Sequence, residues 1–371
     1  FHLKWFKHPK PIIMNSRIIL FILCILNFWA LSAQKKADQV KLTDPDAFSM
    51  IMLSDPQNYI KYDYNQPIFE FMTAWIAENI DSLKIKAVLC TGDLVDQNEC
   101  LLPPYPRFGN QTSRQQWEYV SHAFKRLDNK VPYIISPGNH DYGYTRADTG
   151  ITRFPEYFQV ERNICWKKSL VAVCKNRMGM PTLENAAFQI FDKNWGKILV
   201  ISLEFAPRDA VLNWAKELVT SEKYAKCPVF VITHSYLSGE NKRIGTENYK
   251  ITPANSGEQI WEKLVYPSSN IRLVLCGHYA VPDENFEHNT GYRSDKNSAG
   301  KEVHQMMFNA QALGGGMSGN GGDGWLRILE FLPDGKTIKV KTYSPLFGYS
   351  PSTKGIAWRK EKFDQFDIII E

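Results

Sequence analysis

Apolar and polar positions follow one another along the chain in a pattern typical of alternating strands and helices. From residue 49 onward, short apolar runs are separated by segments in which apolar residues recur every three or four positions. The runs predict buried strands, and the recurring positions predict helices with one apolar face. The strands expected from these runs are Ser49–Ser54, Ala87–Cys90, Val131–Ser136, Ile198–Leu203, Val229–Thr233 and Ile271–Cys276.

Four segments between or beside these strands have the periodicity of helices. Pro207 suits the entry of one of them, because its fixed φ angle matches a first helical turn. Ser256 and Gln259 have the spacing of a capping box at the start of another. Alternating strands and helices predict a largely buried sheet that is covered by helices. The four predicted helices are Pro67–Leu83, Gln115–Leu127, Asp209–Val219 and Ser256–Leu264.

The last part of the chain has a different pattern. Val303–Phe308, Trp325–Phe331 and Thr337–Tyr343 are strand-like and have no helix between them, and Asp334–Gly335 is a hairpin turn signal. Together with the first part, this predicts two packed sheets with helices outside. The glycine-rich segment 314–324 is either a flexible loop over a site or a simple surface connection. For Arg327, within the apolar strand that follows it, one interpretation is a side chain that extends outward to solvent.

The N-terminal region has the order of a secretory signal peptide. After Met14, the charged Arg17 is followed by an apolar stretch, residues 18–31, and by the small residues Ser32 and Ala33. This stretch is shorter than the ~20 residues of a membrane-spanning helix, although an uncleaved anchor is the alternative. We therefore expect translation to start at Met14, residues 1–33 to be a leader, and residues 34–371 to form one domain, strand-rich from about 303. The expected location is secreted or periplasmic, without a membrane span after cleavage.

Composition changes this picture in two respects. The leader holds four of the 44 Lys and Arg residues and none of the 39 Asp and Glu residues, so the rest of the chain is nearly neutral. A nearly neutral chain gives no indication of a nucleic-acid-binding surface. Cys165 and Cys174 are close enough in sequence to close a small disulfide loop, whereas Cys90 and Cys276 end apolar runs, where buried thiols are equally compatible with the pattern. The sequence leaves the pairing of the cysteines open.

Polar residues with metal-binding side chains stand just after five of the predicted strands. Such positions lie at the edge of a sheet, where side chains from different strands meet in one crevice. Singly, a strand-end Asp is more often a helix cap and a strand-end His more often structural. Together, carboxylate, amide and imidazole groups suit divalent Mn, Fe or Zn. The residues are Asp55, Gln57, Asp93, Asn139, His140, Asp141, His234 and His278.

The order of these motifs resembles the calcineurin-like metallophosphoesterase superfamily. D-x-Q, G-D-x-x-D, G-N-H-D, a strand-end His and G-H follow one another between Ser49 and about Ala280. The resemblance implies an α/β fold, a four-layer αββα sandwich of two mixed β-sheets flanked by helices, which agrees with the strand and helix pattern. It also implies a metallophosphoesterase that hydrolyses a small phosphomonoester or phosphodiester by a metal-bound hydroxide in a dinuclear site.

The same resemblance implies a role for each motif residue. Asp93 would bridge two divalent ions, which lie ~3.5–4 Å apart in such sites. His140 would face the substrate, as a proton donor to the leaving group or a stabiliser of developing charge, and Asp141 would orient it. The expected ligands of one ion are Asn139, His234 and His278, and those of the other are Asp55 and Gln57.

Two positions depart from the commonest pattern of the superfamily. Gln57 stands where D-x-H has its histidine, and Ala280 stands where G-H-x-H has its last one. Both missing imidazoles would serve the same ion, so one metal site is expected to be normal and the other weak. Surface residues are possible replacements, namely Asp283, Glu284 and His288.

Three further interpretations stay open on sequence alone. The chain could be a non-catalytic or mononuclear binding protein that retains the fold, and a count of bound metal ions would distinguish this from an enzyme. It could also have a protein phosphatase-like activity. The predicted export argues against this activity, because phosphoproteins are scarce outside the cell. Finally, Glu204 and Arg208 are either residues that orient the site or an ordinary ion pair.

Overall fold

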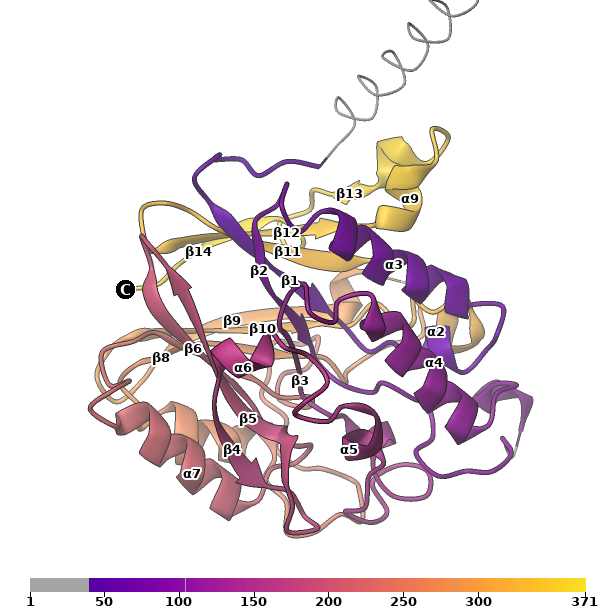
Figure 1. The fold of residues 1–371 in the computed structure, drawn as a ribbon, viewed down its shortest axis with the longest axis horizontal. Coiled ribbons are helices and arrows are strands. Elements are labelled where there is room, and N and C mark those ends of the chain that lie inside the picture. Colours follow the sequence, from indigo (N-terminus) through magenta and orange to yellow (C-terminus); the bar gives the residue numbers. More distant parts are fainter. Residues whose placement is uncertain (1–39, 104, 284) are drawn as a thin grey trace, which may run out of the picture. The chain divides into compact units, whose positions relative to one another are not determined.

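A computed structural model describes residues 40–103, 105–283 and 285–371. Two seven-stranded sheets lie face to face within the unit formed by residues 42–371 (Figure 1). The first sheet contains, in spatial order, β13 (Trp358–Arg359), β12 (Thr337–Tyr343), β11 (Leu326–Phe331), β1 (Phe48–Leu53), β2 (Ile85–Cys90) and β3 (Tyr133–Ile135), with β14 (Phe366–Ile369) beside β12. The second contains β4 (Leu170–Lys175), β5 (Pro181–Asp192), β6 (Gly196–Ser202), β7 (Val229–Ile232), β8 (Ile271–Cys276), β10 (Glu302–Phe308) and β9 (Thr290–Lys296).

Each sheet combines a group of parallel strands with antiparallel strands. In the first sheet β1, β2 and β3 are parallel, and β11 runs antiparallel to β1. In the second sheet β6, β7, β8 and β10 are parallel, while β5 and β9 run antiparallel to their neighbours. The central strands are buried on both faces, as expected for parallel strands between a second sheet and a helical layer.

Helices cover the outer face of each sheet. The helices are α2 (Gln57–Ile60), α3 (Gln66–Glu78), α4 (Ser113–Lys125), α5 (Phe154–Tyr157), α6 (Trp166–Ser169), α7 (Asp209–Thr220), α8 (Gly257–Ile260) and α9 (Pro345–Tyr349). Trp75 of α3 packs against Tyr343, and Phe124 of α4 packs against Tyr133, so these two helices cover the first sheet. The apolar side of α7 packs against β6, β7 and β8 in one buried cluster. The predicted four-layer αββα sandwich is therefore confirmed (Figure 1).

The strands and helices of the sequence pattern occur where they were predicted, with two kinds of exception. The first helix ends at Glu78 rather than at Leu83. Leu83 belongs to the turn that follows the helix, and its side chain is also buried. The pattern also missed β4, β5, β9, β13 and β14. β4 and β9 are half-buried edge strands without a continuous apolar run, and the largely buried β5 is interrupted by polar residues such as Glu184 and Asn185.

The interpretation that Arg327 extends to solvent is wrong. Its side chain is fully buried between the ring of Phe308, 4.7 Å from the guanidinium carbon, and the ring of Phe366. Nη2 donates a hydrogen bond to the carbonyl oxygen of Phe363, 2.8 Å away. Burial lowers the pKa of Arg327 to about 10. Arg327 is buried because the segment that contains Phe363 and Phe366, far along the chain, folds back over β11.

Two other expectations are resolved by the described residues. All six described cysteines are free thiols, so Cys165 and Cys174 do not form the small loop. None of the helices in the described part of the chain has the length and apolar character needed to cross a membrane. The predicted leader, residues 1–33, lies outside the described residues.

Candidate functional site

The predicted site residues converge where the parallel strands of both sheets end. Asp55, Asp93 and Asn139 follow β1, β2 and β3, while His234 and His278 follow β7 and β8. The two edges are joined by reciprocal hydrogen bonds, because Ser136 Oγ donates to Leu203 O (2.6 Å) and Ser202 Oγ donates to Ile135 O (2.7 Å). The site is thus built across the interface of the two sheets.

Four of these residues bring nitrogen or oxygen atoms to one point. Asn139 Oδ1 lies 3.0 Å from His234 Nε2 and 2.9 Å from His278 Nδ1, and the two ring nitrogens are 3.1 Å apart. Asp93 Oδ2 lies 3.2 Å from His234 Nε2. Lone-pair atoms this close need a proton or a cation between them, so the four side chains fit a divalent metal ion.

The backbone fixes the orientation of these ligands. His234 Nδ1 lies 2.7 Å from the carbonyl oxygen of Thr91, which accepts the Nδ1 proton, so Nε2 is the nitrogen that faces the cluster and would bind a cation after losing its proton. Asp93 and His278 adopt left-handed backbone conformations, with φ of 49° and 64°. Residues other than glycine rarely adopt this conformation and it costs energy, which is characteristic of functional sites.

The buried carboxylates of this cluster favour a positive charge beside them. Burial disfavours the charged ring of His234, but the Asp93 and Asp55 carboxylates outweigh it and raise the pKa of His234 to about 10. Burial and the neighbouring His234 charge lower the pKa of His278 to about 3. Although burial acts in the opposite direction, His234 and His140 hold the pKa of Asp93 well below its usual range. A bound divalent cation would supply the positive charge that His234 carries here.

The backbone passes very close to the Asp93 and Asp55 carboxylates at two positions, and this is possible only because both positions are glycines. A Cβ atom at Gly138 would lie 2.2 Å from Asp93 Oδ1, and a Cβ atom at Gly277 would lie 2.2 Å from Asp55 Oδ1. Neither position leaves room for a side chain. The glycines of the G-N-H-D and G-H motifs therefore shape the site without contributing ligands.

His140 lies beside this cluster, but its partner is not the one expected. Its ring Nδ1 lies 2.5 Å from the backbone oxygen of Asp96 and 3.8 Å from Asp96 Oδ1. Asp141 instead accepts hydrogen bonds from the backbone nitrogens of Gly138 (2.8 Å) and Val95 (3.2 Å). The expectation that Asp141 orients His140 is wrong, since Asp141 fixes the surrounding backbone and Asp96 of the G-D-x-x-D motif holds the ring.

Asp55 and Gln57 lie together, but with two partners that the sequence analysis missed. Asp55 Oδ2 accepts hydrogen bonds from Asn309 Nδ2 (2.7 Å), from Gln311 Nε2 (3.1 Å) and from the backbone nitrogen of His278 (3.1 Å). Gln57 Nε2 donates to Gln311 Oε1. Asn309 and Gln311 directly follow a predicted strand, now β10, and that position was the signal that could have identified them.

The surface residues considered as replacement ligands do not join this group in the structure. Asp283 and His288 are exposed and bonded to each other. Glu284 lies outside the described residues. Gln57 is instead bonded to the amide of Gln311, and neither Asp283 nor His288 is bonded to it.

Glu204 and Arg208 form an ion pair that supports the site from behind. Arg208 Nε lies 2.8 Å from Glu204 Oε1, and the fully buried Glu204 also accepts from Asn185 Nδ2. The next residue, Phe205, packs its ring edge-on against His234 and also contacts His278. The pair therefore fixes the loop that supports both imidazoles.

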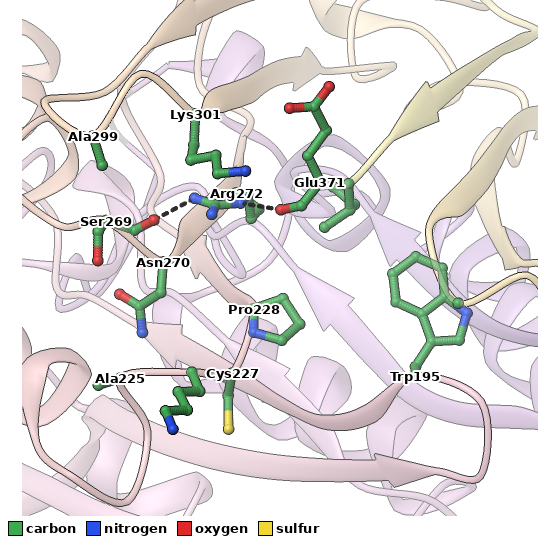
Figure 2. Close-up of a pocket in the computed structure, with 13 residues that line it drawn as sticks. Trp195, Ala225, Cys227, Pro228, Ser269, Asn270, Arg272, Ala299, Lys301 and Glu371 are labelled. Carbon is green, nitrogen blue, oxygen red and sulfur yellow. Dashed lines mark hydrogen bonds between the residues drawn. The ribbon is translucent and has the colours of Figure 1, made fainter.

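A cavity of about 460 Å³ lies elsewhere, at the opposite ends of the same strands (Figure 2). Its wall includes Pro228 and Asn270, which precede β7 and β8, whereas the histidine ligands follow these strands. Arg272 in this cavity is already bonded to Ser269 O and Glu371 O, as Figure 2 shows. The cavity is not part of the site.

Comparisons with known proteins identify the family of the chain. A family model described as calcineurin-like phosphoesterase matches residues 50–282. The chain is 27% identical over 310 residues to the uncharacterized protein YvnB of Bacillus subtilis (strain 168). The matched region covers 81% of this chain but only 20% of YvnB. The chain therefore spans about a fifth of that relative's length.

Two solved structures are similar at low sequence identity. One is described as GAP50, the anchor in the inner membrane complex of Plasmodium, with 11% identity, a TM-score of 0.46, and coverage of 88% of this chain and 89% of that one. The other is PhoD, with 12% identity, a TM-score of 0.42, and coverage of 82% and 67%.

Proposed function

We propose that this chain, which belongs to the calcineurin-like phosphoesterase family, is a metal-dependent hydrolase that cleaves a small phosphorylated ester in a two-cation site. The observation that carries the proposal is the convergence of four donor atoms from Asp93, Asn139, His234 and His278. Asp93 would be shared with a second ion held by Asp55 and Gln57. Bound cations would act as Lewis acids on the phosphoryl oxygens and offset the charge that develops there.

The chain's own residues then have distinct tasks. Because Nδ1 of His140 is bound to the backbone oxygen of Asp96, Nε2 is left to face the substrate, and the side chain is 12% exposed. His140 would give a proton to the leaving oxygen through Nε2, or stabilise the charge on it. Asp96 keeps the ring in this orientation, and its backbone nitrogen is held by Gln116 Oε1.

The proposal also includes export. The order of Arg17, the apolar residues 18–31 and the small residues Ser32 and Ala33 supports a cleaved signal peptide. A substrate outside the cytoplasm follows from this, such as a small phosphomonoester or phosphodiester. N-terminal sequencing of the protein recovered from the culture medium or periplasm tests the cleavage near Ala33.

A direct test measures p-nitrophenol release from p-nitrophenyl phosphate and from its bis ester, with Mn²⁺, Fe²⁺ or Zn²⁺ added. We expect turnover with at least one ester, and a loss of about 10³-fold for Asp93→Asn, because a shared carboxylate ligand becomes neutral. Asp283→Asn is the matched control and should keep full activity, since Asp283 pairs with His288 on the surface. No turnover with any ion, or full activity of Asp93→Asn, would contradict the proposal.

A further inference from the structure

A chain of amide groups connects Asp55 to Gln57. The Asp55 carboxylate, when ionised, only accepts hydrogen bonds, so Asn309 and Gln311 must both turn their NH₂ groups toward Asp55 Oδ2. The orientation of each amide is thus set by the charge it faces. Asn309 is further fixed because its Oδ1 accepts from the backbone nitrogen of Gln311, 3.1 Å away.

These orientations determine how Gln57 lies. Once Gln311 gives its NH₂ group to Asp55, its Oε1 faces Gln57, which must respond with its own Nε2 at 2.5 Å. The carbonyl oxygen of Gln57 consequently points away from Gln311. It is buried and has no hydrogen-bond partner among the described residues, and the whole residue is only 2% exposed. A buried carbonyl oxygen without a partner is unfavourable unless a ligand uses it.

The unpartnered oxygen belongs to the same neighbourhood as two buried carboxylates. The backbone nitrogen of Gln57 donates to the backbone oxygen of Asp93 at 3.0 Å, and the backbone nitrogen of His278 donates to Asp55. Asp55 is fully buried and Asp93 is 2% exposed. Gln57 is therefore bonded through its backbone to the loop of Asp93 and through Gln311 to the carboxylate of Asp55, and no imidazole ring is bonded to Asp55 among the described residues.

We propose that the second cation site is an all-oxygen site that prefers a hard, hydrated cation such as Mg²⁺, and that Asn309 and Gln311 are positioning residues for it. Mg²⁺ typically keeps several waters and binds one or two carboxylates, whereas imidazoles suit Zn²⁺ and Fe²⁺. The two halves of the site are thus chemically different, and the chain holds a mixed pair of ions. This inference rests on the proposed function, because it assumes that Asp93 serves both ions.

Metal content tests the inference without measuring activity. The purified chain, stripped with a chelator, is dialysed to equilibrium against trace Zn²⁺ in a large excess of Mg²⁺, and the bound ions are counted by mass spectrometry. We expect one Zn²⁺ and one Mg²⁺ per chain. Two Zn²⁺, or one Zn²⁺ without Mg²⁺, would overturn the inference and leave the first site intact. Mg²⁺ without Zn²⁺ would also overturn the inference, whereas binding of neither ion, nor of Mn²⁺ or Fe²⁺ in the same dialysis, would instead refute the proposed function.

Two variants test the role of the amides. Gln57→His restores an imidazole and should give two Zn²⁺ and no Mg²⁺. Gln311→Leu releases the Gln57 amide and should weaken Mg²⁺ binding by roughly 10–100-fold while Zn²⁺ stays at one per chain. Unchanged Mg²⁺ affinity in Gln311→Leu would refute the positioning role.

A matched control lies on β10 itself. Gln305 is also buried and also donates its amide to a carboxylate, that of Asp295, at 2.8 Å. Gln305→Leu should therefore keep both ions, and its circular dichroism and melting temperature show the structural cost of losing such an amide. Loss of Mg²⁺ from Gln305→Leu as well would indicate a general packing effect and contradict a specific role for Gln311.

Discussion

The site has two halves, and different kinds of side chain surround the buried carboxylates in each of them. The half with Asn139, His234 and His278 uses donor atoms that meet within about 3 Å of one another and belong to side chains from both sheets. The half with Asp55 and Gln57 uses one carboxylate surrounded by amide groups from the end of β10. A superfamily site can therefore keep its position in the fold while one half exchanges imidazole for amide and the other half stays unchanged.

The largest effect is expected from removing an imidazole of the first half. His234→Asn should reduce phosphoester turnover by about 10³-fold and abolish tight Zn²⁺ binding, because the ring bridges the contacts to Asp93 and Asn139. His288→Asn, a change at an exposed histidine, should have no effect on either. Turnover rates and metal content of the two variants, measured side by side, check this; an active His234→Asn would remove the basis of the first half.

A change outside both halves should affect chemistry without affecting metals. His140→Gln should lower kcat by roughly 10²–10⁴-fold, since it removes a general acid, while both ions stay bound. The loss should be greater for a phosphoester with a basic leaving group than for a p-nitrophenyl ester, which leaves without a proton. Equal losses for both esters would contradict proton donation and favour stabilisation of charge alone.

Two glycines allow the shared carboxylate and the second half to be disturbed in turn. Gly138→Ala places a methyl group against Asp93, and Gly277→Ala places one against Asp55. We expect Gly138→Ala, which displaces the shared Asp93, to weaken the binding of both ions, and Gly277→Ala to weaken mainly Mg²⁺ binding, each by roughly 10–100-fold. Isothermal titration with each ion measures the two affinities. Parallel losses of both ions in both variants would mean that the halves are not independent.

The smallest effect concerns stability. An ion at a hundredfold excess over its Kd adds about 2.7 kcal/mol to the free energy of unfolding. Chelation should therefore lower the melting temperature, Zn²⁺ should restore part of it, and Mg²⁺ added afterwards should restore the rest. Calorimetry or thermal fluorescence measures these steps. Full recovery with Zn²⁺ alone would show that the second half adds nothing to the folded state.

Much of the fold and of the first half could be predicted because both depend on local patterns. Buried parallel strands are continuous apolar runs, and the residue after each run lies at the sheet edge, which located Asp93, Asn139, His234 and His278. The edge strands β4 and β9 escaped prediction because they are half-buried and their side chains are mixed in polarity.

The second half was less predictable because its partners are neutral and distant in sequence. Asn309 and Gln311 lie more than 250 positions from Asp55, and amides after a strand are common in turns. Sequence adjacency also suggested Asp141 as the partner of His140, whereas the short turn at residues 139–141 directs the ring to Asp96. Contacts with a segment that folds back from a distant part of the chain, such as those of Arg327 with Phe363 and Phe366, cannot be derived from local patterns.

The pairing of β1 with β11 has a consequence for the biogenesis of the protein. β1 carries Asp55 at its end and lies between β2 and β11, so the first sheet is incomplete until Phe331 has been synthesised and folded. A chain exported in an unfolded state would cross the membrane with its ligands apart. It would then take its ions from the metal pool of the compartment where it folds, and the ligands of each half would select among the ions present there.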